Sequence, residues 1–160
     1  MLFASPKVTS FTSRLLKHNF PIMKIAEVVA ELRSLNEPVP IPPRLPTEAE
    51  VAAAEKRLNV RFHPDYRYYL LHGSDVTYGV LEPAMVTPNA GHLDLIQMVT
   101  DAWDVGVPRE SLPFCESNGD YYCLQPDGRV VYWSHNGTTD ESWPDLANWI
   151  QQVWMEDEDS

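Results

Sequence analysis

The sequence is poor in cysteine and has no long apolar run. Its two cysteines, Cys115 and Cys123, could in principle be bonded, but a chain without a secretory signal is expected to be reduced and intracellular, so we expect two free thiols. No apolar run approaches the roughly 18 residues that a membrane-spanning helix needs. We therefore predict a cytoplasmic protein without disulfides and without a membrane partner.

Motifs for metals and nucleotides are missing as well. The five histidines are scattered singly, and the nearest approach to a ligand pair is His92 with Asp94, whereas structural zinc sites cluster Cys and His roughly two to four residues apart. There is no H-E-x-x-H and no glycine-rich phosphate loop. We expect no metal and no cofactor. His63 is interpreted as a capping or surface residue at a helix start, and His72 as a helix C-terminal residue that favours the dipole.

Basic residues are scarce outside the first 24 positions. Residues 1–24 carry four basic residues and no acid, while residues 25–160 carry the other eight of the 12 basic residues and all 23 acidic ones, a net charge of −15. Such a surface repels phosphates, so we expect no direct nucleic-acid partner. It suits a basic protein partner, which it attracts at long range. Solubility alone explains the charge equally well.

The first 22 residues allow two interpretations. A basic, acid-free segment with serine and threonine is typical of an organellar presequence. The alternative is a disordered leader or a start assigned too early, with Met23 as the native first residue, because MKIAEVVAELRSL opens a helical pattern at once. N-terminal sequencing of the natural protein would distinguish the two.

The rest of the chain predicts one globular domain. Its length of 160 residues suits a single domain that buries a core without metal or disulfide. A hydrophobic content of 44% with five tryptophans is not that of a disordered protein.

Three helices are expected in the N-terminal half. The first spans 23–36, and a connector with five prolines, 37–46, separates it from the second. The second opens with a capping box at Thr47, and the third covers 64–73 between a proline and a glycine. The apolar faces of the three helices carry Ile25, Val28, Val29, Leu32, Val51, Ala54, Leu58, Tyr66, Tyr69 and Leu70.

The C-terminal half mixes strand and helix patterns. Residues 78–88 are expected to form a strand, which Pro83 confines to an edge or a bulge, and 92–108 a helix that Gly106 closes. Residues 142–154 predict a helix capped by Ser142. Its apolar stripe is Leu146, Trp149, Ile150, Val153 and Trp154. The acidic tail, 156–160, should remain solvated.

The segment 112–136, LPFCESNGDYYCLQPDGRVVYWSHN, concentrates reactive side-chain types. SNGD and QPDG are tight-turn sequences, and the residues between and after them, YYCL and RVVYWS, favour strands. Tyr121 and Cys123 should face one way and Tyr122 and Leu124 the other. We therefore expect a β-hairpin in which Cys123 is a buried mid-strand side chain.

A Cys-His-Asp hydrolase is the competing interpretation of this segment. A nucleophilic cysteine needs a nearby cation or helix N-terminus to lower its pKa, but Cys115 is followed by Glu116 and Asp120, which repel a thiolate. His135 lies about twenty residues further on and could approach only through folding. We therefore predict a protein that is not an enzyme.

The order of three segments is typical of a known family. LPTEAEVAAAEKRLNVRFHPDYRYYLLHGSD (45–75) shows two helices around a short joint, LPFCESNGDYYCLQPDGRVVYWSHN a core hairpin, and SWPDLANWIQQV a closing helix. In this order the chain resembles the SUKH superfamily of the Smi/Knr type over about residues 45–155. It departs from the family pattern at the joint, His63-Pro64 in place of Leu-Pro, and at the turn His72-Gly73-Ser74-Asp75 in place of Asn-Gly-Gly.

The resemblance implies a single-domain α+β fold with a mostly antiparallel sheet flanked by helices. Bacterial members resemble immunity proteins that bind and neutralise a cognate toxin, and eukaryotic relatives act as intracellular scaffolds in cell-wall regulation. With the acidic charge, it predicts a non-enzymatic protein that occludes the active site of a basic, nucleic-acid-targeting toxin. The alternative is a scaffold or regulatory module of cell-wall or stress signalling.

Charge and strand-face alternation select six candidate partner contacts: Asp75, Asp101, Asp104, Asp120, Tyr122 and Trp133. Carboxylates can occupy a basic cleft in place of phosphates, and buried aromatic anchors are worth about 2 kcal/mol or more each. A structural alternative stays open for each residue. The aspartates of 92–108 can be a solvated helix face, and the two aromatic residues can belong to the core.

Overall fold

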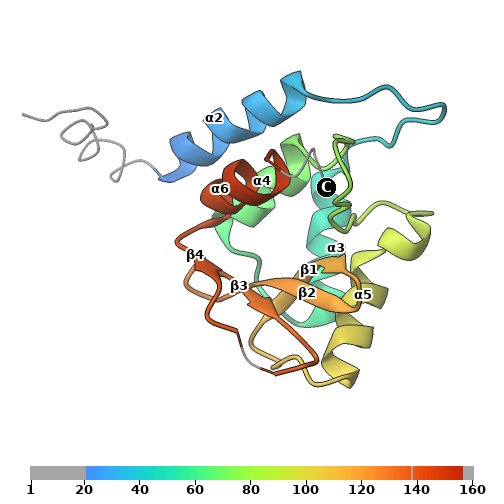
Figure 1. Ribbon diagram of the computed structural model, residues 1–160. Helices are drawn as coiled ribbons and strands as arrows, with labels where there is room; N and C mark the ends of the chain where they lie inside the picture. The colour runs from blue at the N-terminus through green and yellow to red at the C-terminus, as the bar shows by residue number, and fades with distance from the viewer. Residues whose placement is uncertain (1–20, 138, 157–160) are drawn as a thin grey trace, which may run out of the picture.

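The computed structural model describes residues 21–137 and 139–156. In these ranges five α-helices and a four-stranded antiparallel sheet form a single-domain α+β fold (Figure 1), so the predicted fold class is confirmed. Of the predicted leader only positions 21 and 22 are described, and of the predicted acidic tail only Glu156; the rest of both segments lies outside the described residues.

The three predicted N-terminal helices all form, and the first begins and ends two residues earlier than the predicted 23–36. They are α2 (Pro21–Ser34), α3 (Glu48–Leu58) and α4 (Pro64–His72), and the connector between α2 and α3 contains neither helix nor strand. The capping box is confirmed, because Thr47 Oγ1 accepts from the Glu50 N–H at 3.1 Å while the Glu50 carboxylate accepts from the Thr47 N–H at 3.0 Å. The ten apolar positions named above for these helices are all buried.

Both ends of α4 depend on specific contacts. His63 caps α4, since its Nδ1 accepts a hydrogen bond from the Asp65 N–H at 3.1 Å. Gly73 follows α4, where a Cβ would lie 3.0 Å from Cγ1 of Val29. Glycine therefore lets α2 pack closely against the end of α4.

The sheet has the strand order β1-β2-β3-β4, and all pairs are antiparallel. Its strands are Leu112–Ser117, Asp120–Leu124, Val130–Trp133 and Ser142–Trp143. The predicted hairpin is β2–β3. The β1–β2 turn has positive φ at Asn118 and Gly119, 55° and 87°, as a two-residue hairpin turn requires. A bulge between Pro113 and Cys115 shifts the register of β1.

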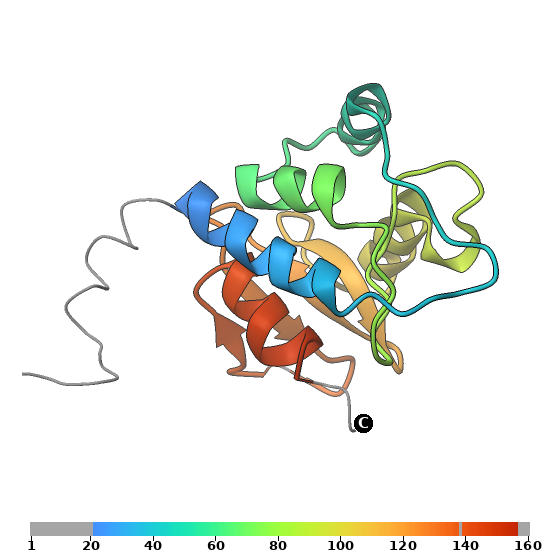
Figure 2. The ribbon, with the colours of Figure 1, turned by 90° about the horizontal axis from the view of Figure 1, so that it is seen from above.

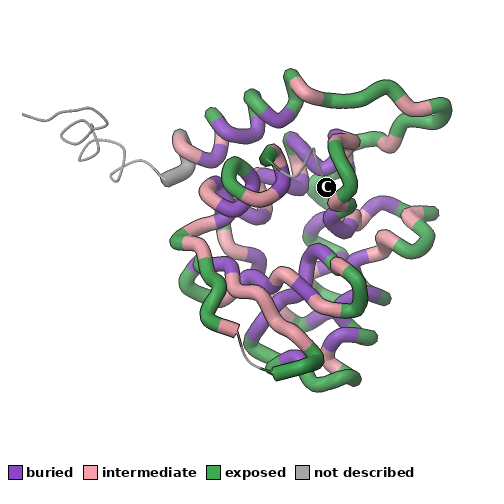
Figure 3. The backbone as a smooth tube through the Cα atoms, viewed as in Figure 1, coloured by how far each residue is buried: buried purple, intermediate pink, exposed green. Residues whose placement is uncertain are grey.

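Helices cover both faces of the sheet. Figures 1 and 2 show α2, α4 and α6 together on one side, with α2 lying over the other two and farther from the sheet. Tyr122 and Phe114 meet Trp149 of α6 there, at ring-centroid distances of 5.2 and 4.9 Å. α5 (Leu95–Asp104) packs on β1, and the turn after it lies near Trp133. The burial pattern in Figure 3 places the core between these layers.

The predicted strand 78–88 does not form. Within this segment the structure has a single bridge, between Met85 and Asp94. Pro83 lacks a backbone donor, and the Ala84 N–H bonds instead to the carbonyl of Phe114, the residue at the bulge, at 2.8 Å. The segment is therefore an irregular strap tied to the sheet and to the start of α5.

The closing helix begins three residues later than predicted. Ser142 and Trp143 form β4, because the residue before a proline favours extended backbone. Asp145 is the N-cap, and it accepts from the Asn148 N–H at 2.8 Å. α6 (Leu146–Trp149) continues into a π-helical turn, η2 (Ile150–Trp154), and four of the five stripe residues are buried, the exception being Val153.

The helix predicted over 92–108 is shorter than expected. A 3-10 turn, η1 (Gly91–Leu93), precedes α5, and Asp94 caps α5 by accepting from the Gln97 N–H at 3.0 Å. Gly106 follows the helix with φ of 117°, near the predicted stop. None of the helices in the described ranges combines the length and apolarity that crossing a bilayer requires.

Candidate functional site

The reactive residues of segment 112–136 separate into the core and the surface. Cys115 and Cys123 are fully buried and neither is in a disulfide, as predicted. Burial raises the pKa of Cys123 to about 12. Asp120 and His135 do come together, with Oδ1 2.6 Å from Nδ1, but the His135 side chain is 55% exposed whereas Cys115 lies in the core. The arrangement supports the hairpin and not a cysteine nucleophile.

Asp120 is the centre of a small hydrogen-bond cluster. It accepts from the backbone N–H of His135 at 3.1 Å and from the Tyr132 hydroxyl at 3.0 Å. Burial acts to raise the pKa of Asp120, but the hydrogen bonds from His135 and Tyr132 outweigh it, and this pKa lies below its ordinary value. Burial and the neighbouring carboxylate raise the pKa of Tyr132 to about 12. The cluster fastens the end of β3 to the start of β2.

No group of three or more His, Cys, Asp and Glu side chains within residues 21–137 and 139–156 could hold a metal ion. His92 faces Glu82 across 3.5 Å, and Asp94 caps α5 instead of joining His92.

An acidic groove of about 820 Å³ lies where the strap, the start of α5 and the β1–β2 turn meet. We use the name acidic groove for the surface formed by Val80, Glu82, Met98, Asp101, Glu116, Tyr121 and their neighbours. Three carboxylates line it, and the described residues along it include no lysine or arginine. Its chemistry therefore suits a cationic, partly apolar occupant.

Each groove carboxylate is exposed and has one polar neighbour. Asp101 accepts from Gln97 Nε2 at 2.9 Å, and Glu116 accepts from the Gly119 N–H at 2.7 Å. Tyr121, only 9% exposed, lies on the groove wall. Burial, followed by the charges of Glu116 and Asp101, raises the pKa of Tyr121. The two carboxylates thus create a negative potential around this ring.

The six predicted contact residues occupy different environments. Asp101 lies in the acidic groove, and Asp104 is exposed at the end of the same helix. Asp120 belongs to the His135 cluster, and Trp133 is half-buried with its ring centroid 6.1 Å from that of Tyr121.

The other two predicted contacts lie elsewhere. Asp75 forms an ion pair with Arg33 at 2.6 Å, and Tyr122 packs between Trp149, Tyr132 and Trp143. Sequence reasoning missed Glu82 and Glu116. The two-residue turn at Asn118-Gly119 places Glu116 opposite Tyr121, so the hairpin register was the signal that could have identified Glu116.

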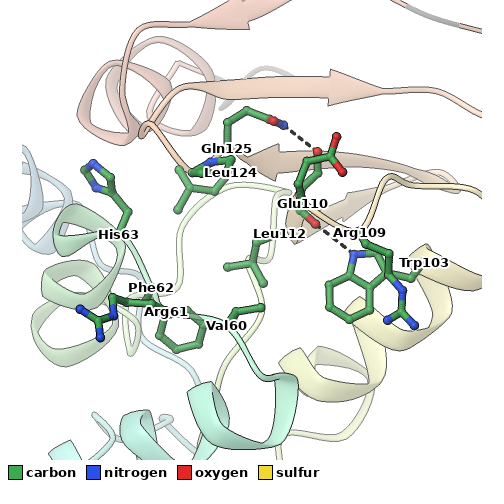
Figure 4. A pocket seen from close by; sticks show the side chains of 12 residues that line it. Val60, Arg61, Phe62, His63, Trp103, Arg109, Glu110, Leu112, Leu124 and Gln125 are labelled. Carbon is green, nitrogen blue, oxygen red and sulfur yellow. Dashed lines mark hydrogen bonds between the residues drawn. The ribbon is translucent and has the colours of Figure 1, made fainter.

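A second concavity, the apolar pocket, opens at the other end of the β1–β2 pair. It has a volume of about 250 Å³, and Figure 4 shows Phe62 and Trp103 on its two sides with Leu112 and Leu124 between them. Trp103 Nε1 donates to the Ser111 carbonyl at 3.0 Å, and Gln125 Nε2 donates to Ser111 Oγ at 2.8 Å. The walls of the apolar pocket come from four separate parts of the chain, so no local sequence motif predicts the pocket.

Comparisons with known proteins agree with this architecture. A family model described as SUKH_5, SMI1-KNR4 cell-wall, matches residues 25–155, which includes most of α2 and the whole connector. A crystal structure of a protein from Pseudomonas syringae pv. tomato is 43% identical, with a TM-score of 0.78, and the match covers 82% of this chain and 98% of that one. No curated protein matches. The chain belongs to the SUKH family of SMI1-KNR4 type.

Proposed function

We propose that this chain is an immunity-type protein that binds a basic protein toxin in the cytoplasm, with the acidic groove as its contact surface. Membership of the SUKH family is consistent with a protein-binding role. The observation that carries the proposal is the groove itself, in which Glu82, Asp101 and Glu116 surround a nearly buried Tyr121.

The acidic groove would neutralise the toxin by receiving the cationic side chains around its active site, so that the bound chain covers the cleft. Enzymes that act on nucleic acids present Lys and Arg to phosphates, and carboxylates can pair with the same cations. The net charge of −11 would steer the encounter at low ionic strength. Met98 and Tyr121 offer apolar surface behind the carboxylates, where a cationic side chain can bury its aliphatic stem.

The predicted contact residues enter the proposal unequally. Asp101 is central, and Asp104, Asp120 and Trp133 follow it on the adjoining parts of α5 and the hairpin. Asp75 and Tyr122 stay predictions without a place in the groove. Glu82 and Glu116 join the proposed contact set.

Capture of the partner tests the proposal. The tagged full chain is used to capture proteins from its own cells, and the capture is done at low and at high salt. The product of the adjacent reading frame is tested for binding in the same way. We expect one basic partner whose binding weakens as salt screens the charges. Failure to capture a partner under either condition would count against a binding function.

Charge-neutral variants then locate the contact. Glu82→Gln, Asp101→Asn and Glu116→Gln together should weaken partner binding by about tenfold per carboxylate, since a close charge pair is worth on the order of 1.5 kcal/mol. A matched control neutralises three exposed acids elsewhere, Glu27, Glu31 and Glu48. Equal losses in both sets would show that net charge, and not the groove, governs binding.

The alternative is a scaffold or regulatory module of cell-wall or stress signalling, which the cell-wall description of the matching family favours. Capture of several envelope or signalling proteins, with little dependence on salt, would support it over immunity.

A further inference from the structure

The apolar pocket has the features of a site for a small ligand. Its volume of about 250 Å³ is just below the roughly 300–1,000 Å³ of pockets for drug-sized ligands. A cavity of roughly 150 Å³ already holds benzene, so this pocket can hold one ring with a short substituent. Phe62 and Trp103 face the space from opposite sides, and the buried side chains of Leu112 and Leu124 lie between them (Figure 4).

Three polar residues of the pocket wall, Trp103, Ser111 and Gln125, are already paired with one another. The dashed lines in Figure 4 mark the hydrogen bonds from Trp103 to the Ser111 carbonyl and from Gln125 to Ser111 Oγ. These donors are therefore not available to a ligand without breaking an existing bond. The interior of the pocket therefore suits the apolar part of a ligand.

The rim of the pocket is different in charge from the rest of the molecule. Arg33, Arg44, Arg67, Arg129 and Lys24 all form ion pairs. Among the described residues, four basic side chains form no ion pair with a described carboxylate, namely Lys56, Arg57, Arg61 and Arg109. Three of them belong to the end of α3 and the segment after it, and the fourth lies across the pocket.

Two of these unpaired cations line the opening. Arg61 neighbours Phe62, and the guanidinium of Arg109 lies 4.7 Å from the centre of the Trp103 ring. Figure 4 shows them on opposite sides of the pocket, each with its guanidinium directed away from Leu112. Glu110 is the one carboxylate of the lining, so two arginines outnumber it. Both arginines are exposed, and their long side chains can turn toward an anion at the mouth.

We infer that the apolar pocket binds a small aromatic carboxylate, with its ring between Phe62 and Trp103 and its carboxylate at Arg61 and Arg109. An apolar interior and a cationic rim together match one molecule that is apolar at one end and anionic at the other. The inference is independent of the toxin proposal, since it uses different residues and a ligand of opposite charge.

Three probes of similar size and different charge test the inference. Phenylacetate, 2-phenylethanol and phenethylamine are titrated into the ¹⁵N-labelled full chain, and the indole N–H signal of Trp103, assigned with Trp103→Phe, is followed by NMR. We expect saturable shifts, with phenylacetate binding about two- to fivefold more tightly than the alcohol and the amine binding least. Absence of saturable shifts, or equal affinity for acid and amine, would overturn the inference.

Arginine variants separate the rim from general charge. Arg61→Gln with Arg109→Gln should reduce phenylacetate affinity to that of 2-phenylethanol and leave the alcohol unaffected. Arg44→Gln with Arg129→Gln, two paired arginines outside the pocket lining, is the matched control and should retain the preference for the acid. Preference retained in the rim variant, or lost equally in the control, would contradict the assigned role of the rim.

Discussion

The acidic groove and the apolar pocket use the same three elements in opposite ways. β1, β2 and α5 contribute to both, but the groove takes the end of β1 and the start of β2, whereas the pocket takes the start of β1 and the end of β2. Because β1 has six residues, its two ends, and with them the groove and the pocket, lie about 17 Å apart along the strand. The groove is built mainly from exposed side chains, three of them carboxylates, and the pocket from core residues with charged side chains at the mouth. One strand pair thus keeps two surfaces of opposite sign apart.

The largest expected difference between the pocket and the groove is in how much their wall residues contribute to the free energy of unfolding. Leu124, on the pocket wall, is 3% exposed, and Leu124→Ala should lower the free energy of unfolding by about 3 kcal/mol through loss of packing. Val80, on the groove wall, is 58% exposed, and Val80→Ala should change it by less than about 0.5 kcal/mol. Urea denaturation measures both. Similar losses for the two variants would erase the distinction between a core-built pocket and a surface-built groove.

A smaller effect is expected beside the groove, at Asp120. Asp120→Asn should destabilise the fold by about 1–2 kcal/mol at neutral pH, because the ionised carboxylate accepts hydrogen bonds from His135 and Tyr132. Its folded pKa lies below the unfolded value near 4, so this stabilisation is present above that value and is lost as the pH falls through the folded pKa.

Urea denaturation at pH 7 and at pH 3 therefore checks the Asp120 cluster. The difference between wild type and Asp120→Asn should shrink at the lower pH. Asp104→Asn, at an exposed helix end, should show almost no difference at either pH. A loss at Asp120 that is independent of pH would mean that the carboxylate charge is not what stabilises the hairpin.

The smallest expected effect is the change in the free energy of unfolding when charges are neutralised, and its sign should differ between the acidic groove and the apolar pocket. Asp101→Asn with Glu116→Gln relieves repulsion in an acidic protein and should slightly stabilise it at low salt. Arg61→Gln with Arg109→Gln should slightly destabilise it, and both changes should stay within about 0.5 kcal/mol. Thermal unfolding at low and high ionic strength measures them. Differences that persist at high salt would indicate lost contacts and not long-range charge.

Much of the fold could be predicted because its signals are local. The capping box at Thr47 and the turn at Asn118-Gly119 involve neighbouring residues only, and both form as predicted. The resemblance to the SUKH family rested on such elements. The strand predicted over 78–88 was wrong because its prolines deny it a ladder, and the closing helix starts at Asp145 because pairing of Trp143 with Val130 takes the earlier residues into the sheet.

The candidate surfaces were harder to predict because they depend on distant contacts. Asp101 was selected for its charge, but only the fold brings it near Glu82 and Glu116. The apolar pocket combines residues from 60–63, 103, 109–112 and 124–126. Its apolar members resemble ordinary core residues in the sequence, and no spacing rule relates Arg61 to Arg109.

The bulge in β1 has a consequence for how this family can evolve. It pairs Cys115 with Tyr122 and Glu116 with Tyr121, so that Glu116 projects on the α5 side of the sheet. The β1–β2 turn fixes the pairs on its own side of the bulge, so loss of Phe114 would leave Glu116 opposite Tyr121 and would instead remove the ring that packs on Trp149. A lineage can therefore change the aromatic packing between β1 and α6 by a one-residue insertion or deletion at the bulge, while the acidic groove and both hairpin turns stay as they are.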